Sequence, residues 1–482
     1  MNKSKIVSSK KLYTLATLAV GGWLLSSCAD TYSGNDAFDG GVRNAQLVSP
    51  AEGDITITPN TDGDKMTITW PVVFGAGGYE VFLYDLSNDE VISSDTIDGC
   101  SHTYDREEDV NYKLTIRTLG NKKLNNSDAP SATEKLFNSF EASFATIPEG
   151  DLYEYFQKNP IPETSAGQNL NFDLTPGGHY TVSDVLDFGK FMVTLRSTNK
   201  TNNAIITYNE GGGLATCTGF KAKYITFECE ASTQPVLALS AEPNPEILDA
   251  DHNNHHQIVE PISFQNCQVN NVKRMFMYDN KVKYCVKNFS ITNTVVKFTP
   301  DEKMSSSAYF QIYDGGGFIN DFTATNCTFW CANSNKVQYF IRYNNSGRCD
   351  RAGYLTNSIN FKSCTFYNIA KEGQMANHGG FDGRNTSNYD ITNNIFVDCG
   401  SGQVPRRITG RISDAATNNF AYNTYWFNGA PETEGFTTNS YDKSGNALQS
   451  DPAFEDAANG NFKPTGSEQV ARKTGDPRWW NN

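Results

Sequence analysis

A short segment recurs along the second half of the chain and constrains its fold more than any other feature. Its clearest copies are "FTATNCTF" and "INFKSCTF", which begin at Phe322 and Ile359. In the second copy, Ile359 and Phe361 alternate as on one face of a strand. Cys364 comes one position too late to continue that face, so the chain must bend at Ser363. The segment therefore predicts two short strands joined at a polar corner.

Seven copies of this segment follow one another at similar intervals. Aligned on the polar position, successive copies lie 27 to 37 residues apart. The aligned residues are Cys229, Asn266, Asn293, Asn326, Ser363, Asn393 and Asn423. A repeat of this length with loops of variable size is typical of stacked coils, and a short polar side chain at a corner can bond the local backbone. A β-sandwich would give alternating strands but no recurring corner, so the sequence predicts a parallel β-helix over residues 170–482.

The N-terminus has the pattern of a bacterial lipoprotein signal peptide. Four lysines precede the apolar run "LYTLATLAVGGWLL", and the run ends in "LSSC" at Cys28. The apolar run is shorter than the roughly 20 residues that cross a membrane. We expect residues 1–27 to be removed, Cys28 to be lipidated, and residues 28–43 to form a flexible tether. A plain signal peptide with an incidental cysteine is the alternative.

Residues 44–147 contain short alternating strands separated by turns. "DKMTITW", "GGYEVFLYD" and "VNYKLTIRTLGN" each place apolar residues at every second position. The early Trp70, the Gly-Tyr-Glu-Val strand and Tyr112 before Leu-x-Ile-Arg resemble a fibronectin type III domain, in which Tyr112 would be the corner tyrosine. The resemblance implies a small β-sandwich that acts as a spacer, with glycan binding as the alternative. Residues 148–169 are rich in proline and predict a linker.

Composition and cysteine spacing exclude several classes of function. The chain has 482 residues, a formal charge of -14 and 12% aromatic residues, which does not fit a basic nucleic-acid-binding protein. It has 11 cysteines but no Cys-x-x-Cys spacing, so a zinc or redox motif is not supported. Cys267, Cys327 and Cys364 occupy equivalent places in the repeat, which favours buried thiols. Cys327 with Cys331 is a candidate disulfide, as is Cys349 with a neighbour.

The coils with "NCTF" and the tail "DPAFEDAANGNFKPTGSEQVARKTGDPRW" resemble right-handed parallel β-helices of the pectate-lyase-like superfamily. The order of lipobox, fibronectin-like module, β-helix and final "DPRW" is similar to that of uncharacterised surface lipoproteins from gut bacterial glycan-utilisation systems. The resemblance implies an all-β chain that is lipid-anchored at the outer membrane, on the cell surface. Its implied partners are a uronic-acid polysaccharide and neighbouring glycan-utilisation proteins. No catalytic motif carries over.

Two basic segments in this acidic chain predict a groove for an anionic sugar chain. Residues 335–351 and 384–411 lie on neighbouring coils, so their loops could share one side. If Val337 faces inward, alternation places Phe340 and Arg342 on the outer surface of a coil. The predicted substrate-binding residues are Lys336, Phe340, Arg342, Arg348, Arg351, His378 and Arg384. The alternative is that these are solvated loop charges or structural arginine–carboxylate pairs.

The loop "HGGFDGRN" (378–385) looks most like an active site, because it combines a histidine, an aspartate and an arginine with three glycines. Asp382 is the candidate Ca²⁺ ligand, and Arg342 and Arg384 are the candidate catalytic residues. A glycine-rich connector between coils is the alternative. "DHNNHH" (251–256) is expected to be a polar insertion loop.

Three hypotheses of function follow. The first is recognition of an acidic, pectin-like polysaccharide on the β-helix. The second is a polysaccharide lyase that cleaves the same polymer by β-elimination, with Ca²⁺ as a candidate cofactor. The third is a structural or adhesive surface protein. No "DD" pair occurs in the chain, which argues against a hydrolase of the polygalacturonase kind.

Overall fold

The structure, a computed structural model, describes residues 40–60, 64–333, 336–344, 347–381, 384–410, 416–431 and 441–480. Cys28 and the expected signal peptide lie outside these ranges. The chain divides into two compact units, residues 1–140 and 141–482. None of the helices in the described ranges has the length and apolar character needed to cross a membrane.

The first unit is a sandwich of two antiparallel sheets around one apolar core. The three-stranded sheet has the order β1-β2-β5, and the four-stranded sheet has the order β4-β3-β6-β7. The strands are β1 (Thr56–Pro59), β2 (Lys65–Thr69), β3 (Ala76–Asp85), β4 (Glu90–Ile97), β5 (Ser101–Asp105), β6 (Asn111–Gly120) and β7 (Thr133–Asn138).

Tyr112 in this sandwich has the geometry expected of a corner tyrosine. Its hydroxyl accepts a hydrogen bond from the Glu107 N–H at 3.0 Å and donates to the Glu107 carbonyl at 3.3 Å. The expected sandwich is therefore present. Its kinship with fibronectin type III domains stays a prediction.

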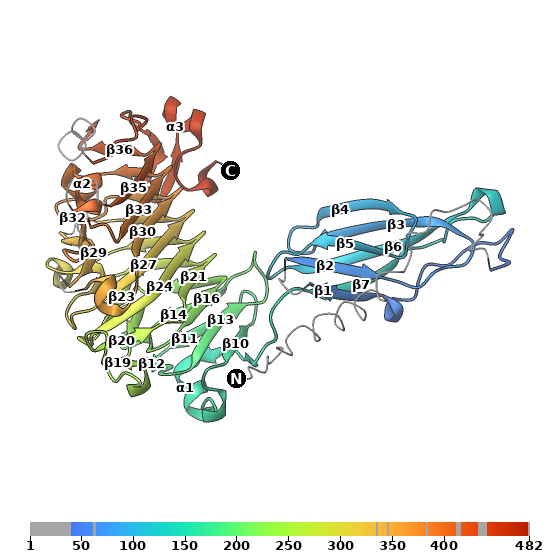
Figure 1. The fold of residues 1–482 in the computed structure, drawn as a ribbon, viewed down its shortest axis with the longest axis horizontal. Coiled ribbons are helices and arrows are strands. Elements are labelled where there is room, and N and C mark those ends of the chain that lie inside the picture. The colour runs from blue at the N-terminus through green and yellow to red at the C-terminus, as the bar shows by residue number, and fades with distance from the viewer. Residues whose placement is uncertain are drawn as a thin grey trace, which may run out of the picture. The chain divides into compact units, whose positions relative to one another are not determined.

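The second unit is a parallel β-helix, so the predicted fold is confirmed. Three parallel sheets run along it, and Figure 1 shows their strands following one another along the axis from α1 towards β36. Sheet 1 contains β8 (Ala145–Ile147), β10 (Asn169–Leu174), β13 (Met192–Ser197), β16 (Phe220–Lys223), β21 (Ile262–Gln265), β24 (Tyr284–Thr292), β27 (Phe318–Thr325), β30 (Asn357–Lys362), β33 (Ser387–Thr392) and β35 (Thr417–Ala421), with β19 (Leu248–Asp249) and β20 (His255–Ile258) at its side.

Sheets 2 and 3 complete each coil. Sheet 2 contains β9 (Gly150–Asp151), β11 (His179–Val182), β14 (Ala204–Tyr208), β17 (Ile225–Glu228), β22 (Gln268–Val272), β25 (Val295–Phe298), β28 (Thr328–Cys331), β31 (Thr365–Tyr367), β34 (Ile395–Val397), β36 (Thr424–Phe427) and β37 (Ala430–Pro431). Sheet 3 contains β12 (Val185–Asp187), β15 (Gly213–Thr216), β18 (Leu237–Leu239), β23 (Met277–Tyr278), β26 (Ala308–Ile312), β29 (Tyr339–Tyr343) and β32 (Gln374–Asn377). The C-terminal part adds α2 (Val404–Thr409), β38 (Phe454–Asp456), β39 (Asn461–Pro464) and α3 (Ser467–Arg472).

The region expected to be a linker, 148–169, belongs to the β-helix instead. It contains β9, which pairs with β11, and helix α1 (Leu152–Lys158). Leu152 and Phe156 lie one helical turn apart and are both buried, and the ring of Phe156 lies 5.0 Å from that of Phe172. The helix thus covers the open end of the apolar core, which would otherwise be exposed to water.

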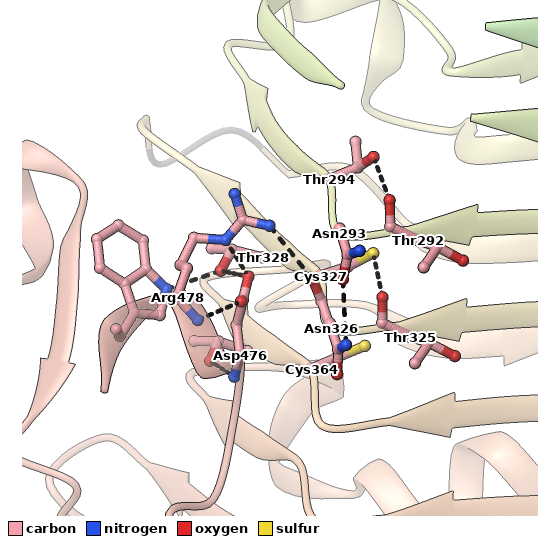
Figure 2. Close-up of polar contacts among 12 residues, drawn as sticks. Thr292, Asn293, Thr294, Thr325, Asn326, Cys327, Thr328, Cys364, Asp476 and Arg478 are labelled. Carbon is pink, nitrogen blue, oxygen red and sulfur yellow. Dashed lines mark hydrogen bonds and ion pairs between the residues drawn. The ribbon is translucent and has the colours of Figure 1, made fainter. Parts of the chain in front are cut away.

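The polar corners take a left-handed backbone conformation. Asn266, Asn293, Asn326, Ser363 and Asn393 have φ between 49° and 61°, a region that asparagine tolerates better than most residues. At each corner the backbone N–H donates to a carbonyl of the next coil, as from Asn326 to Lys362 at 3.0 Å. The Asn326 side chain also donates to Asn293 Oδ1 at 3.1 Å (Figure 2). The corners therefore stack along one edge, as predicted.

In the first and last copies of the repeat, the aligned residues Cys229 and Asn423 are not the corners. The left-handed corners there are Tyr224 and Tyr422, with φ of 57° and 54°. Cys229 follows β17, and Asn423 lies one position beyond its corner. A tyrosine at the corner gave no polar signal to align on.

The position after the corner forms a second stacked row inside the coil. It holds Cys267, Thr294, Cys327, Cys364, Asn394 and Asn423. The Cys267 N–H donates to Thr294 Oγ1 at 3.2 Å, and the Cys364 N–H donates to Asn394 Oδ1 at 2.9 Å. The ten cysteines of the described ranges are free thiols, and all of them except Cys100 are buried. The prediction of buried thiols is confirmed, and Cys327 and Cys331 are not joined.

Substitution at a corner should separate backbone strain from side-chain loss. Asn266→Val should lower the free energy of unfolding by about 1–3 kcal/mol, because a β-branched residue is strained at positive φ. Asn266→Gly should stay within about 1 kcal/mol of wild type, because glycine takes this conformation freely. Urea unfolding followed by circular dichroism would measure both. Equal destabilisation of the two variants would contradict the left-handed corner.

Alkylation should distinguish the buried thiols from Cys100. Burial raises the pKa of Cys267 to about 12 and raises that of Cys364 as well, so both stay protonated and unreactive at mildly alkaline pH. Iodoacetamide followed by peptide mapping should label Cys100 in the folded chain and Cys267 only after unfolding. Labelling of Cys267 as fast as Cys100 would show that the row is open to solvent.

Candidate functional site

One register position of sheet 3 forms a row of outward residues, which we call the sheet 3 ladder. Its members, paired from strand to strand, are Asp187, Ala215, Ala238, Tyr278, Gln311, Arg342 and Asn377. The residues directly before Tyr278 and Gln311, Met277 and Phe310, are buried in the core. Because side chains alternate along a strand, the ladder points away from the core. Neighbouring members repeat at about 4.8 Å, the spacing of strands in a sheet.

Arg342 lies near one end of this ladder, on a platform of aromatic rings. Its guanidinium carbon is 3.8 Å from the centre of the Tyr313 ring and 5.0 Å from that of Tyr339, both within the range of a cation–π interaction. One Nη donates to the Ser306 carbonyl at 3.3 Å, and Nε is buried without a partner. Among the described residues, no carboxylate forms an ion pair with Arg342. This half-buried cation therefore keeps hydrogen-bonding capacity for a ligand.

Acidic side chains lie beside the ladder on the coils that precede Arg342. The Gln311 side chain donates to both carboxylate oxygens of Asp314 at 3.3 Å. Asp279 is fully buried and accepts from the backbone N–H groups of Gly315 at 2.8 Å and Lys281 at 3.0 Å. Burial raises the pKa of Asp279 to about 6. Burial, together with the nearby acids, also raises the pKa of Tyr278 to about 12.

Two predicted binding residues are wrong because their side chains are inside the protein. Phe340 has no exposed surface and packs among core rings, with Phe329 at 5.3 Å and Phe366 at 5.5 Å. Strict alternation from Val337 predicts it outside, but three successive residues of β29, Tyr339 to Ile341, are buried. His378 is 2% exposed, and its Nε2 lies 2.7 Å from the Ile408 carbonyl. It is therefore placed to hold the loop to α2 and not to meet a substrate.

Other predicted cations take part in contacts on the protein surface. Lys336 pairs with Glu372 at 3.2 Å, Arg348 pairs with Asp350, and Arg384 Nε donates to the Gly380 carbonyl at 2.7 Å. Arg351 is exposed. These contacts match the alternative of structural pairs more closely than a shared groove. Asp382, the candidate Ca²⁺ ligand, lies outside the described residues.

The glycine-rich loop that begins at His378 contacts the first basic segment at Gly347 and Arg348. A Cβ added at Gly380 would lie 1.9 Å from the Gly347 carbonyl oxygen and 3.1 Å from Arg348 Cγ. Glycine is therefore needed there for the loops to touch. This contact joins the loop before Arg348 to the loop before Arg384, whereas Arg342 stands on the sheet itself.

Sequence reasoning missed the residues that surround Arg342. Tyr313 and Tyr339, whose rings contact the Arg342 guanidinium, carry no signal of a binding site in the sequence. Gln311 and Asn377 had no local signal. Aligning sheet 3 strands by coil would have found them, because each follows a buried residue at the same register position.

The histidine-rich loop forms local contacts. His252 Nδ1 lies 2.8 Å from Asp249 Oδ2, and His255 is fully buried beside the ring of Phe318. Over the ranges that the structure describes, no three His, Cys, Asp or Glu side chains are grouped so that they could hold a metal ion.

Three family models match parts of the chain, each described as a domain of unknown function. They cover residues 1–175 (DUF4992), 178–334 (DUF4957) and 359–479 (DUF5123). No curated protein matches. One similar solved structure is pectate lyase PelI from Erwinia chrysanthemi in complex with tetragalacturonic acid, at 12% identity and a TM-score of 0.16, over 67% of this chain and 84% of that one. A likeness this slight carries no argument, so the fold assignment rests on the strand register above.

The pKa of Asp279 predicts a change of stability with pH. Its folded value of about 6 exceeds the ordinary 3.8, so the folded chain holds an extra proton between these values. Stability should therefore fall as pH rises through this window, by an amount on the order of 2 kcal/mol. Between about pH 4 and about pH 7, the free energy of unfolding of Asp279→Asn should rise by that amount relative to wild type, as measured by urea unfolding. Parallel pH profiles of the two proteins would contradict the raised pKa.

Proposed function

We propose that the β-helix binds an acidic, pectin-like polysaccharide along the sheet 3 ladder, with Arg342 holding a sugar carboxylate. The observation that carries this proposal is the stacked guanidinium without a carboxylate partner. A guanidinium presents paired N–H donors that match a carboxylate, and stacking on an aromatic ring fixes its plane. Tyr313 and Tyr339 hold Arg342 in this way.

The surroundings of Arg342 suit a polymer better than a small molecule. Asn377 flanks it on the neighbouring strand and offers amide donors and acceptors to sugar hydroxyls. Gln311, on the other side, is buried, and its amide already bonds the Ala308 N–H and the Asp314 carboxylate. An extended chain that crosses the strands would meet Arg342 and Asn377 on neighbouring strands about 4.8 Å apart, and Tyr278 two strands from Arg342. The half-buried Tyr278 and Tyr313 add flat apolar faces.

Recognition is favoured over the alternative of β-elimination. A lyase needs a base that takes the proton from C5 of the sugar. An arginine stays protonated near neutral pH because its pKa is above about 12, and the pKa of Tyr278 is raised to about 12. Both groups therefore serve better as hydrogen-bond donors than as bases.

The setting of this function follows the sequence. In our proposal a lipid on Cys28 anchors the chain to the outer membrane at the cell surface, and the N-terminal, fibronectin type III-like sandwich acts as a spacer. The β-helix then presents the polysaccharide to neighbouring proteins of a glycan-utilisation system. The supporting features are the lipobox and the tether that precede the sandwich.

Calorimetric titration of the full chain with tetragalacturonic acid tests this function. Arg342→Gln should weaken binding about tenfold or more, because a hydrogen bond to a charged group contributes about 1.5–3 kcal/mol. Arg348→Gln is the matched control, because it removes an arginine whose guanidinium is already paired with the Asp350 carboxylate. This variant should bind tetragalacturonic acid as wild type does. Unchanged affinity in Arg342→Gln, or no binding by wild type, would overturn the proposal.

An ultraviolet assay separates recognition from lyase activity. We expect wild type incubated with polygalacturonate and Ca²⁺ to produce no unsaturated product, because Asp187, the one carboxylate among the ladder members, stands at the opposite end of the ladder from Arg342. A steady rise in absorbance that disappears in Arg342→Gln would establish the lyase alternative.

A further inference from the structure

A second cleft, on sheet 2, is made by parts of the chain that the proposed function does not use. It has a volume of about 570 Å³ and is open to solvent. Its walls include Glu228, Asn270, Lys297, Trp330, Arg478 and Trp479. We infer that this cleft is a carbohydrate site of its own, for a short neutral sugar chain.

Outward residues of four adjacent strands make the floor of the cleft. In β17 and β22, Glu228 lies beside Asn270, and in β25 and β28, Lys297 lies beside Trp330. The register of β22 against β25 shifts between Val269 and Val272. Such a bulge re-aims the side chains around it and is common beside binding sites.

The C-terminal tail makes the opposite wall, and buried hydrogen bonds hold it on sheet 2. Asp476 is 1% exposed; its carboxylate accepts from Thr328 Oγ1 at 2.7 Å, and its N–H donates to Thr365 Oγ1 at 3.1 Å. Figure 2 shows Asp476 beside Thr328, with Arg478 reaching the corner at Asn326. Trp479 Nε1 donates to Thr328 Oγ1 at 2.9 Å. Residues about 150 positions apart in the chain are thus fixed next to each other.

The two tryptophans are fixed in place by the tail. The ring of Phe462 lies 5.5 Å from that of Trp330 and 5.7 Å from that of Trp479. Gly460 has φ of 85°, and a Cβ there would lie 3.1 Å from Trp330 Cζ2. Trp330 also lies beneath Lys297, whose Nζ is 5.2 Å from the ring centre. Trp330 is 7% exposed, so the half-buried indole of Trp479 supplies the open apolar face of the cleft. A rigid indole ring presents this face at little cost in conformational entropy.

The polar wall offers both donors and acceptors. The Asn270 side chain donates to Glu228 Oε1 at 2.7 Å and accepts from Gln268 Nε2 at 3.1 Å. This chain of amides and one carboxylate can exchange hydrogen bonds with hydroxyls that serve as both donor and acceptor. The combination of indole faces with amides and a carboxylate fits a pyranose, which has apolar C–H faces and a hydroxyl rim.

The charges of the cleft favour a neutral ligand. Arg478 Nε pairs with the Asp476 carboxylate at 2.6 Å, so that cation is already compensated. Glu228 and Lys297 remain, and their formal charges cancel. A polyanion would gain no net attraction here, in contrast to Arg342 on sheet 3. The volume lies within the usual range of about 300–1,000 Å³ for ligand sites.

Fluorescence titration of the full chain with four neutral tetrasaccharides tests this inference. The probes are galactotetraose, arabinotetraose, xylotetraose and cellotetraose, and at least one should cause a saturable change in tryptophan emission. Asn270→Ala should weaken that binding by about threefold to tenfold, the value of a hydrogen bond. Trp479→Phe, which retains an aromatic ring, should reduce the emission change. It serves as the second test if Asn270→Ala does not fold.

Crossed controls distinguish this site from the proposed function. Arg342→Gln should leave neutral-sugar binding unchanged, and Asn270→Ala should leave tetragalacturonic acid binding unchanged. The cleft assignment is overturned if none of the four probes binds. It is also overturned if Arg342→Gln abolishes their binding while Asn270→Ala has no effect.

Discussion

Every feature of the second unit depends on hydrogen bonds between coils at the polar corners. A corner N–H donates to the carbonyl of the coil that follows, with the corner residue held at positive φ. This contact fixes the angle between sheets 1 and 2 and also the register of each coil on its neighbour. Because the register is kept, residues one coil apart in the sequence come to lie side by side, as Asn293 and Asn326 do. Without it, neither the sheet 3 ladder nor the floor of the cleft on sheet 2 would exist.

The two outer faces built in this way differ in chemistry. Sheet 3 presents a stacked arginine among tyrosines, and burial raises the pKa of Asp279, which follows β23 of this sheet. Sheet 2 presents tryptophans, amides and balanced charges, and the C-terminal tail closes one side of it. A regular scaffold can hold both, since changing an outward side chain does not disturb the core. In our two proposals the β-helix is a rigid support with separate surfaces for acidic and neutral sugar chains.

The sequence predicted the scaffold well because the scaffold is periodic. The repeat spacing and the shift of phase at Ser363 identified the coils, the corners and the buried thiols. It predicted the site less well because outward residues obey no period. The charge of Arg342 identifies it, but alternation misplaces Phe340 because β29 buries three successive residues. Tyr313 becomes a neighbour of Arg342 only because β26 and β29 are paired. The wall formed by the C-terminal tail depends on contacts such as Thr328 with Asp476, which no local pattern indicates.

A crystal structure of the full chain with tetragalacturonic acid would test the central claim most directly. The account predicts the tetrasaccharide across the outer face of sheet 3, with one sugar carboxylate within hydrogen-bonding distance of the Arg342 guanidinium. An oligosaccharide bound on another face, with Arg342 still unpaired, would contradict it.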